Sequence, residues 1–230
     1  MRDAMIIPIS DKEELVITTD CSGGVGQSED DIVKVPYEVV AYFTTRVALM
    51  ELLSVGAKPI CYTLSNLTTD GYQNIHHGVL KALNEVDISN LENISSSETN
   101  FELKQSGLGI SFIGKRSKTH VDKIDNLLYA VIGYPLVGDE VVDNPEKIVS
   151  LEMFKRLVGD KRIVDILPVG SKGIKFEMKE VFNKTVIKSE LDMIKSSGPS
   201  TCIIISFEDR FYSELQSELG SLFNLIECTK

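Results

Sequence analysis

The sequence has little of what metal-centred or disulfide-stapled folds need. It has no tryptophan, three histidines and four cysteines in 230 residues. The cysteines form no CxxC pair, and an even count in a chain of this length does not make a disulfide framework. The histidines lack the spacing of a zinc site. We therefore expect no zinc, and a reducing cytoplasm is the expected location. The cysteines are Cys21, Cys61, Cys202 and Cys228.

Long apolar runs and excess positive charge are also missing. No apolar run approaches the roughly 18–20 residues that a membrane-spanning helix needs. The first nine residues carry one basic residue, with Asp3 and Pro8, which does not fit a signal peptide. Lys and Arg number 24 against 34 Asp and Glu, a net charge of −10, whereas duplex binding depends on cations that neutralise phosphates. We expect neither a membrane nor a nucleic acid as partner.

What is present is an ordinary globular composition. Hydrophobic residues make up 43% and charged residues 25%, enough for a packed core. At roughly 100–200 residues per domain, the chain allows one large domain or two small ones. Strand and helix patterns mix in both halves, and no low-complexity linker separates them. We predict an α/β (α+β mixed) fold in two lobes, dividing near residues 117–125, with domains 1–120 and 121–230.

The first half is dominated by one buried helix. Residues Tyr37–Val55 are apolar over most of the helix circumference, with Pro36 at the start and Gly56 at the C-terminal end. Residues 88–100 are polar and rich in Ser, Asn and Glu, and predict a loop. The other expected elements are the strands Leu15–Thr19, Ile60–Leu67 and Gly107–Gly114 and the amphipathic helix Asp70–Val86.

The second half alternates in the same way. The expected strands are Leu127–Gly133, Ile163–Leu167, Thr185–Lys188, Thr201–Phe207 and Leu222–Ile226. The expected helices are Pro145–Val158, Ser171–Phe182 and Asp209–Leu219.

Asp20 ends the first strand and precedes a glycine-rich turn. The turn contains Gly23, Gly24 and Gly26. Backbone N–H groups of such a turn and a neighbouring carboxylate can share one ligand. The motif is neither a Walker A loop nor GxGxxG, so a plain flexible turn is the alternative.

Glu51 lies in the arc of Val40 and Thr44 on the apolar helix. A carboxylate there needs a counter-charge, because an uncompensated buried charge costs several kcal/mol. A metal ion would supply it, and so would an ion pair with Arg46 or Lys58. The spacing leaves both interpretations open.

Two more acids join these as candidates. Glu98 lies in a Ser-rich loop, where a solvated acid is the alternative, and Asp3 lies near the start of the chain. Carboxylates with hydroxyls and glycines, and few histidines, suit a hard cation such as Mg²⁺. Mg²⁺ usually completes its shell with water and substrate phosphate. The pattern therefore points to nucleotide chemistry, with Asp3, Asp20, Glu51 and Glu98 as candidate metal ligands.

Several of these motifs resemble the aminoimidazole-ribonucleotide synthetase superfamily, which includes selenophosphate synthetase and thiamine-phosphate kinase. The Gly-Ala-x-Pro element of that group is intact at Gly56–Pro59. Its Asn-Asp pair is replaced by Met50-Glu51, and its Gly-Gly-Glu loop by Ser96-Ser97-Glu98. Asp3 resembles its N-terminal aspartate. The remaining matching segments are Thr19-Asp20 with the glycine-rich turn, Ser97–Thr99 and Ser106–Gly109.

Within that superfamily the sequence is most similar to bacterial α-ribazole kinases. The likeness extends over nearly the whole chain. Its longest matching segments are Asp20–Gly26, Asp31–Pro36, Tyr42–Pro59, Leu167–Ile174 and Lys195–Cys202. The resemblance implies ATP-dependent phosphorylation of a nucleoside 5′-hydroxyl in salvage of the lower ligand of cobalamin.

The resemblance also implies roles for residues. It implies an N-terminal lobe with a mixed sheet and helices that binds Mg-ATP, a shortened C-terminal α/β lobe that closes over the acceptor, and a homodimer. No general base can be named. The implied nucleotide contacts are Asp20, Gly23, Gly24, Gly26 and Thr99. The implied acceptor contacts are Ser171, Lys172, Gly173, Ser197 and Gly198, which by themselves fit plain capping turns equally well.

Two other functions remain open at this level. One is another enzyme of the superfamily, a small-molecule kinase of the thiamine-phosphate type or an ATP-dependent synthetase. The other is a nucleotide-binding sensor or accessory subunit without catalysis.

Overall fold

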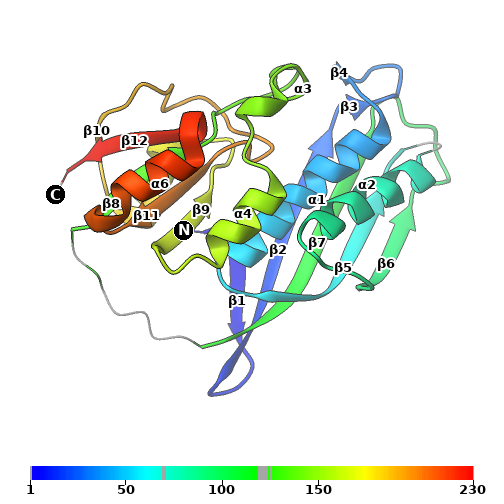
Figure 1. Cartoon of the computed structure of the whole chain (residues 1–230). Helices are drawn as coiled ribbons and strands as arrows, with labels where there is room; N and C mark the ends of the chain where they lie inside the picture. Colours follow the sequence, from blue (N-terminus) through cyan, green and yellow to red (C-terminus); the bar gives the residue numbers. More distant parts are fainter. Residues whose placement is uncertain (1, 69–70, 119–123, 125, 230) are drawn as a thin grey trace. The chain divides into compact units, whose positions relative to one another are not determined.

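The computed structural model describes residues 2–68, 71–118, 124 and 126–229 (Figure 1). The chain forms two compact units, Asp3–Lys118 and a second unit of residues 119–230 together with residues 1–2. The predicted division between residues 120 and 121, and the predicted helix start at residue 70, lie outside the described residues.

A five-stranded sheet, ordered β1-β2-β7-β5-β6, forms the frame of the N-terminal unit. β5 and β6 run parallel, and the other neighbours are antiparallel. The sheet is therefore mixed, as predicted. Its strands are β1 (Ala4–Pro8), β2 (Glu13–Gly23), β5 (Lys58–Asn66), β6 (Glu92–Ser97) and β7 (Gly107–Ser117).

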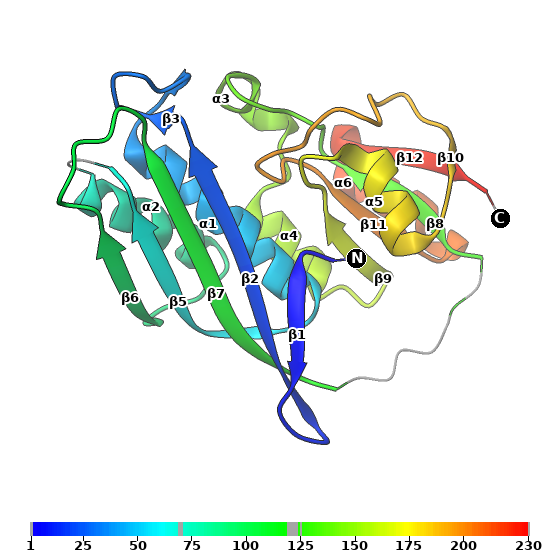
Figure 2. The same cartoon turned by 180° about the vertical axis from the view of Figure 1, so that it is seen from behind.

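Two helices, α1 (Tyr37–Ser54) and α2 (Tyr72–Glu85), cover one face of this sheet, and Figure 2 shows the sheet in front of them. The Thr18 hydroxyl of β2 donates to the Ala48 carbonyl of α1 over 2.7 Å. Between β2 and α1 the chain forms a small parallel pair, β3 (Val25–Gly26) with β4 (Val33–Lys34). The core lies between the helices and the Thr18 face of the sheet.

The sequence analysis predicted neither of the two edge strands of this sheet. The predicted loop over residues 88–100 contains β6, which pairs with β5 from Cys61 opposite Glu92 to Asn66 opposite Ser97. Side chains of β6 are mostly exposed on both faces, so the segment has no alternation of apolar and polar residues. β1 is equally exposed. Backbone pairing with a long interior neighbour holds each of them.

The C-terminal unit contains an antiparallel sheet ordered β10-β12-β8-β11-β9. β11 is buried along its whole length, which explains why its sequence is apolar except for Ser206. The strands are β8 (Leu128–Ile132), β9 (Ile163–Pro168), β10 (Val186–Lys188), β11 (Ile203–Phe207) and β12 (Phe223–Cys228). The helices are α3 (Glu140–Asp143), α4 (Leu151–Val158), α5 (Gly173–Phe182) and α6 (Tyr212–Leu219), with short 3-10 turns at Pro145–Lys147, Asp209–Phe211 and Gly220–Leu222.

The predicted helix over 145–158 is in fact broken. A 3-10 turn ends at Lys147, and α4 begins only at Leu151. Ser150 caps α4, since its hydroxyl accepts the Met153 N–H over 3.1 Å. The break arises because Ile148 is extended.

Arg2 belongs to the C-terminal unit although Asp3 belongs to the N-terminal one. Its guanidinium pairs with Asp165 and donates to the Ile166 carbonyl, both on β9. No disulfide joins the four cysteines in the described part of the chain. Among the described residues, no helix combines the length and the apolar character required to cross a membrane.

Candidate functional site

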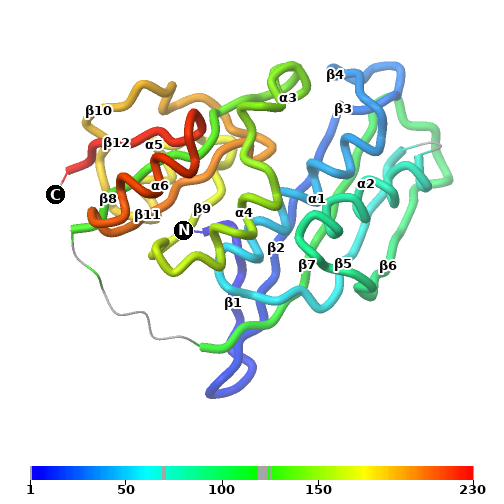
Figure 3. Tube along the Cα trace, viewed as in Figure 1, coloured from blue at the N-terminus to red at the C-terminus, as the bar shows by residue number. Residues whose placement is uncertain are grey.

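One end of the N-terminal sheet collects most of the predicted nucleotide contacts. There β2, β5 and β6 stop and β7 starts, and we call this the glycine end. The register places Ser22 opposite Leu108, Leu108 opposite Asn66, and Asn66 opposite Ser97. The glycine-rich turn and the loop with Glu98 and Thr99 therefore leave the sheet at the same level. Figure 3 traces the chain from β2 through β3 and β4 into α1 at this end.

Both helices of this unit begin at the glycine end. A Cβ added to Gly71, which precedes α2, would lie 2.5 Å from a ring carbon of Tyr37, the first residue of α1. A helix N-terminus carries partial positive charge on N–H groups without helical partners, and such ends bind anions. Two of them side by side make this end of the sheet favourable for phosphate.

The glycine-rich turn needs glycine for two reasons. Gly24 and Gly26 have φ of +69° and +148°, which side-chain-bearing residues rarely adopt. A Cβ on Gly26 would also lie 2.7 Å from Ser106 Oγ and 2.7 Å from Tyr37 Cε1. The Gly24 N–H donates to the Ser106 carbonyl over 2.9 Å, so this donor holds the turn to β7. The predicted role of the turn in phosphate binding therefore has to use its other N–H groups.

Asp31 was not selected as a site residue from the sequence, although it lies at the centre of this end. Its carboxylate accepts hydrogen bonds from Ser28 N (2.8 Å), Ser106 N (2.7 Å) and Ser106 Oγ (2.7 Å). Burial acts to raise its pKa, but the hydrogen bonds from Ser106 and Ser28 and the charge of Lys34 outweigh burial, so its pKa lies below the usual value. Asp31 is therefore ionised and fully engaged at neutral pH.

Asp20 lies three residues before the end of β2. It shares the helix-covered face with Val16 and Thr18, because side chains alternate along a strand. At about 3.3 Å per residue, its Cα is roughly 10 Å from that of Gly23. Burial raises its pKa to about 7, against a weaker opposing hydrogen bond from the Cys21 N–H. Asp20 thus changes charge near neutral pH.

The other predicted acids lie elsewhere in the unit. Asp3 directly precedes β1, and the pairing of Ala4 with Thr18 puts it on the sheet face opposite Asp20. Glu98 follows β6, three strand spacings from β2, or roughly 14 Å. Its carboxylate accepts the Asn100 N–H over 2.6 Å, and this bond lowers its pKa. Thr99 beside it is exposed.

Glu51 is buried in α1, with 6% of its surface exposed. Ala48 lies over Thr18, and α1 runs away from the glycine end, so Glu51 lies a further turn away from that end. In the part of the chain that the structure describes, no three His, Cys, Asp or Glu side chains gather where they could hold a metal ion. The described structure therefore does not gather the four predicted acids at one point.

The two predicted acceptor motifs of the C-terminal unit lie side by side. The Ser197 N–H donates to the Gly170 carbonyl over 3.2 Å, and the Lys175 N–H donates to the Met193 carbonyl over 2.8 Å. Gly173, with φ of +79°, packs so closely that a Cβ would lie 2.8 Å from the Lys195 carbonyl. The structure thus brings together turns that are separated by more than twenty residues in sequence.

Within these turns the side chains differ in availability. Ser171 and Lys172 are exposed, and the Lys172 ammonium lies 4.4 Å from the centre of the Phe176 ring. The Ser197 hydroxyl is fully buried, accepts the Cys202 N–H over 3.1 Å and lies 2.9 Å from Thr201 Oγ1. It holds the loop that carries Gly198, so this hydroxyl is not available to a ligand.

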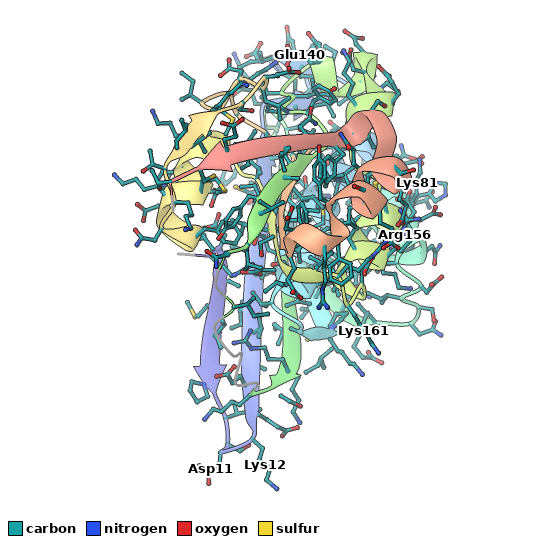
Figure 4. All side chains as sticks on the ribbon, turned by 60° about the vertical axis from the view of Figure 1, so that its left-hand side comes forward. Asp11, Lys12, Lys81, Glu140, Arg156 and Lys161 are labelled. Atoms are coloured by element: carbon teal, nitrogen blue, oxygen red, sulfur yellow. The ribbon has the colours of Figure 1, made fainter. Side chains whose placement is uncertain are left out.

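A salt bridge supports the same corner of the unit. Lys195 Nζ lies 2.8 Å from Glu140 Oε1 at the start of α3, and Figure 4 labels Glu140. Hydrogen bonding to Lys195 lowers the pKa of Glu140. The pair ties the loop before Ser197 to the segment that follows β8.

Comparison with solved structures identifies the fold. The chain is similar to thiamine monophosphate kinase from Aquifex aeolicus, with a TM-score of 0.64, 10% identity, and coverage of 100% of this chain and 89% of that one. It is also similar to phosphoribosylformylglycinamidine synthase II from Thermotoga maritima, with a TM-score of 0.60, 12% identity, and coverage of 99% and 37% respectively. A structure of the Thermotoga enzyme complexed with ATP gives a TM-score of 0.57, 13% identity, and the same coverage.

No protein-family model and no curated protein matches the sequence. The chain spans 37% of the length of the Thermotoga synthase and nearly all of the Aquifex kinase. At these identities the likeness concerns the fold. The predicted mixed α/β fold is thereby confirmed as one that this chain shares with the Aquifex kinase and the Thermotoga synthase.

Proposed function

We propose that this chain is an ATP-dependent phosphotransferase whose N-terminal unit binds the nucleotide phosphates at the glycine end of its sheet. The observation that carries the proposal is the meeting of two helix N-termini, at Tyr37 and Gly71, beside the turn that contains Gly24 and Gly26. One protein of the same fold is a thiamine monophosphate kinase, and another has been solved with ATP. Transfer of a phosphoryl group depends mainly on positioning and charge neutralisation, which such an end can supply.

Mg²⁺ is part of this proposal, but the described acids do not fit a site built by the protein alone. Mg²⁺ in nucleotide enzymes is usually held by one or two carboxylates together with the phosphates. We therefore propose that the ion arrives with the nucleotide. Asp20 is the first candidate for a protein ligand, because burial raises its pKa to about 7 and a cation beside it would favour the ionised carboxylate.

For the acceptor we propose α-ribazole, phosphorylated on its 5′-hydroxyl. The support is the likeness of residues 167–174 and 195–202 to α-ribazole kinases, together with the close packing of these two segments in the C-terminal unit. Ser171 and Lys172 are the exposed side chains there, and both can donate hydrogen bonds to a polar ligand.

We also propose a homodimer, on grounds other than the resemblance. The strands predicted at residues 15–19, 60–67 and 107–114 are interior strands of the sheet, whose edges are β1 and β6. The sheet face away from α1 carries exposed apolar side chains instead. Met5 is 62% exposed and Ile94 70% exposed, and the register puts Ile17 and Ile113 on the same face. A second copy of the chain is the occupant we propose for it.

A turnover screen tests the function. ATP consumption is followed in the presence of α-ribazole, other nucleosides and phosphorylated vitamins. Phosphorylation of α-ribazole supports the full proposal, and turnover with another acceptor keeps the kinase and replaces the substrate. Tight ATP binding without turnover for any acceptor identifies a sensor or accessory subunit. Absence of ATP binding overturns the proposal.

A further inference from the structure

Asp31 ties three segments of the N-terminal unit together. It is 6% exposed, and its two oxygens accept three hydrogen bonds, from Ser28 in the glycine-rich turn and from the backbone and side chain of Ser106 before β7. The Tyr37 hydroxyl, at the first residue of α1, lies 3.2 Å from Ser106 Oγ and 3.3 Å from Ser28 Oγ. The carboxylate therefore connects the turn to the strand start directly, and to the helix start through the hydroxyls of Ser28 and Ser106.

The turn packs directly onto this carboxylate. A Cβ on Gly26 would lie 3.0 Å from Asp31 Oδ2, so the glycine backbone is pressed against the acid. Further bonds hold the flanks, from Gln105 Nε2 to the Asp30 carbonyl (2.8 Å) and from Lys34 Nζ to the Ser28 and Glu29 carbonyls. A glycine-rich segment has many accessible conformations, and fixing one of them requires such anchors.

These contacts suit a residue that holds the turn in one conformation and does not itself contact the ligand. The carboxylate is closed off from solvent, and the hydrogen bonds above occupy both of its oxygens. A negative charge at a phosphate site repels the ligand, and the donors turned toward this carboxylate, together with the charge of Lys34, offset part of that repulsion. Lys34, which binds the adjacent carbonyls, contributes to this compensation.

We propose that Asp31 is the positioning residue of the nucleotide site: it holds the Gly24–Ser28 turn in its phosphate-binding shape by accepting the Ser28 and Ser106 donors. The identity of the ligand in this inference rests on the proposed function, whereas the anchoring of the turn does not. Substitution of Asp31 therefore acts on nucleotide affinity through the shape of the turn, and leaves the acceptor contacts of the other unit unchanged.

The test compares Asp31→Asn with the wild type and with Asp30→Asn, a matched control at an exposed neighbour. Amide hydrogen exchange of residues 24–28 is measured without nucleotide, and affinity for the β,γ-methylene analogue of ATP is measured with Mg²⁺. In Asp31→Asn we expect faster exchange in the turn and an affinity lower by about tenfold or more, as expected for lost charge-assisted hydrogen bonds. Asp30→Asn is expected to match the wild type in both.

Ser106→Ala serves as the second variant, because it removes one hydrogen bond to Asp31 and keeps the carboxylate. It is expected to show a smaller change of the same kind, and it decides the matter if Asp31→Asn does not fold. Unchanged exchange in the turn of a folded variant overturns the positioning role. Wild-type analogue affinity in a variant with a loosened turn overturns the link to nucleotide binding. A wild-type protein that does not bind the analogue overturns the proposed function. In that case the hydrogen-exchange data still test whether Asp31 anchors the turn.

Discussion

At Gly26, both the lack of room for a side chain and the backbone conformation require glycine. A Cβ there would meet Ser106 Oγ and Tyr37 Cε1, both at 2.7 Å, on a backbone with φ of +148°. We predict that Gly26→Ala lowers the unfolding free energy by about 1–3 kcal/mol, the usual range for a strained backbone position. It should also weaken nucleotide binding, because the turn must shift. Denaturant unfolding beside analogue binding checks this, and Gly56→Ala, which has φ of +76° and no close neighbour, controls for conformational strain alone.

The raised pKa of Asp20 predicts the direction in which the stability of the protein changes with pH. Because the folded protein holds this proton up to about pH 7 and an unfolded chain loses it near pH 4, the contribution of Asp20 to stability declines as pH rises between those values. Asp20→Asn is therefore expected to remove part of the loss of stability between pH 5 and pH 8. Thermal melts of both proteins at the two pH values test this. Parallel pH profiles would contradict it.

The protonation state of Asp20 is also expected to affect the affinity for Mg-ATP. If Asp20 contacts the cation that accompanies ATP, protonation weakens that contact, so Mg-ATP affinity of the wild type is expected to rise from pH 6 to pH 8. Asp20→Asn should bind more weakly and with a flatter profile. Isothermal titration with the ATP analogue provides the measurement. An identical rise in the variant would exclude Asp20 as its source.

For single residues, the sequence identifies the glycines of the turn but not Asp31, the residue that holds the turn in place. Gly24 and Gly26 stand out because glycine marks turns, whereas Asp31 and Ser106 are 75 residues apart and follow no periodic pattern. Glu51 is buried as its helical arc predicts. Its distance from Asp20 could not be predicted, because the direction in which α1 crosses the sheet is set by tertiary packing.

At the level of elements, periodicity predicts what is buried and fails at exposed edges. α1 and β11 are apolar because neighbours cover them, so their sequence patterns are strong. β6 is held by backbone pairing with β5, and its Ser, Asn and Glu side chains carry no signal of a strand. The split of residues 145–158 into a 3-10 turn and α4 depends on Ser150, whose capping role the overall helical pattern obscures.

Ser150 gives a direct test of that boundary. Its hydroxyl accepts the Met153 N–H at the start of α4. Ser150→Ala should lower the unfolding free energy by ~1 kcal/mol, as for other N-cap serines. Ser213→Ala, at an exposed position inside α6, is the matched control and should change stability by less than about 0.5 kcal/mol. Equal effects in urea unfolding would show that Ser150 does not act as a cap.

At the scale of the whole molecule, the uncovered face of the N-terminal sheet predicts an assembly. Light scattering at micromolar concentration is expected to give twice the chain mass of 25.5 kDa. Met5→Glu combined with Ile94→Glu should yield a folded monomer, since both side chains are exposed in the single chain. Leu80→Glu, an exposed apolar position on α2, should leave the dimer intact. A wild-type monomer would overturn the proposed assembly.

The anchoring of Arg2 on β9 bears on how the chain can be divided. Because Arg2 pairs with Asp165 and donates to the Ile166 carbonyl, the C-terminal unit is not a contiguous stretch of sequence. A fragment that starts at residue 119 lacks this guanidinium and leaves the Asp165 carboxylate without it. Its calorimetric melting temperature should lie below that of the same unit in the whole chain. A short peptide with the sequence of the chain start, added in excess, should recover part of the difference, and an Arg-to-Gln version of that peptide should not.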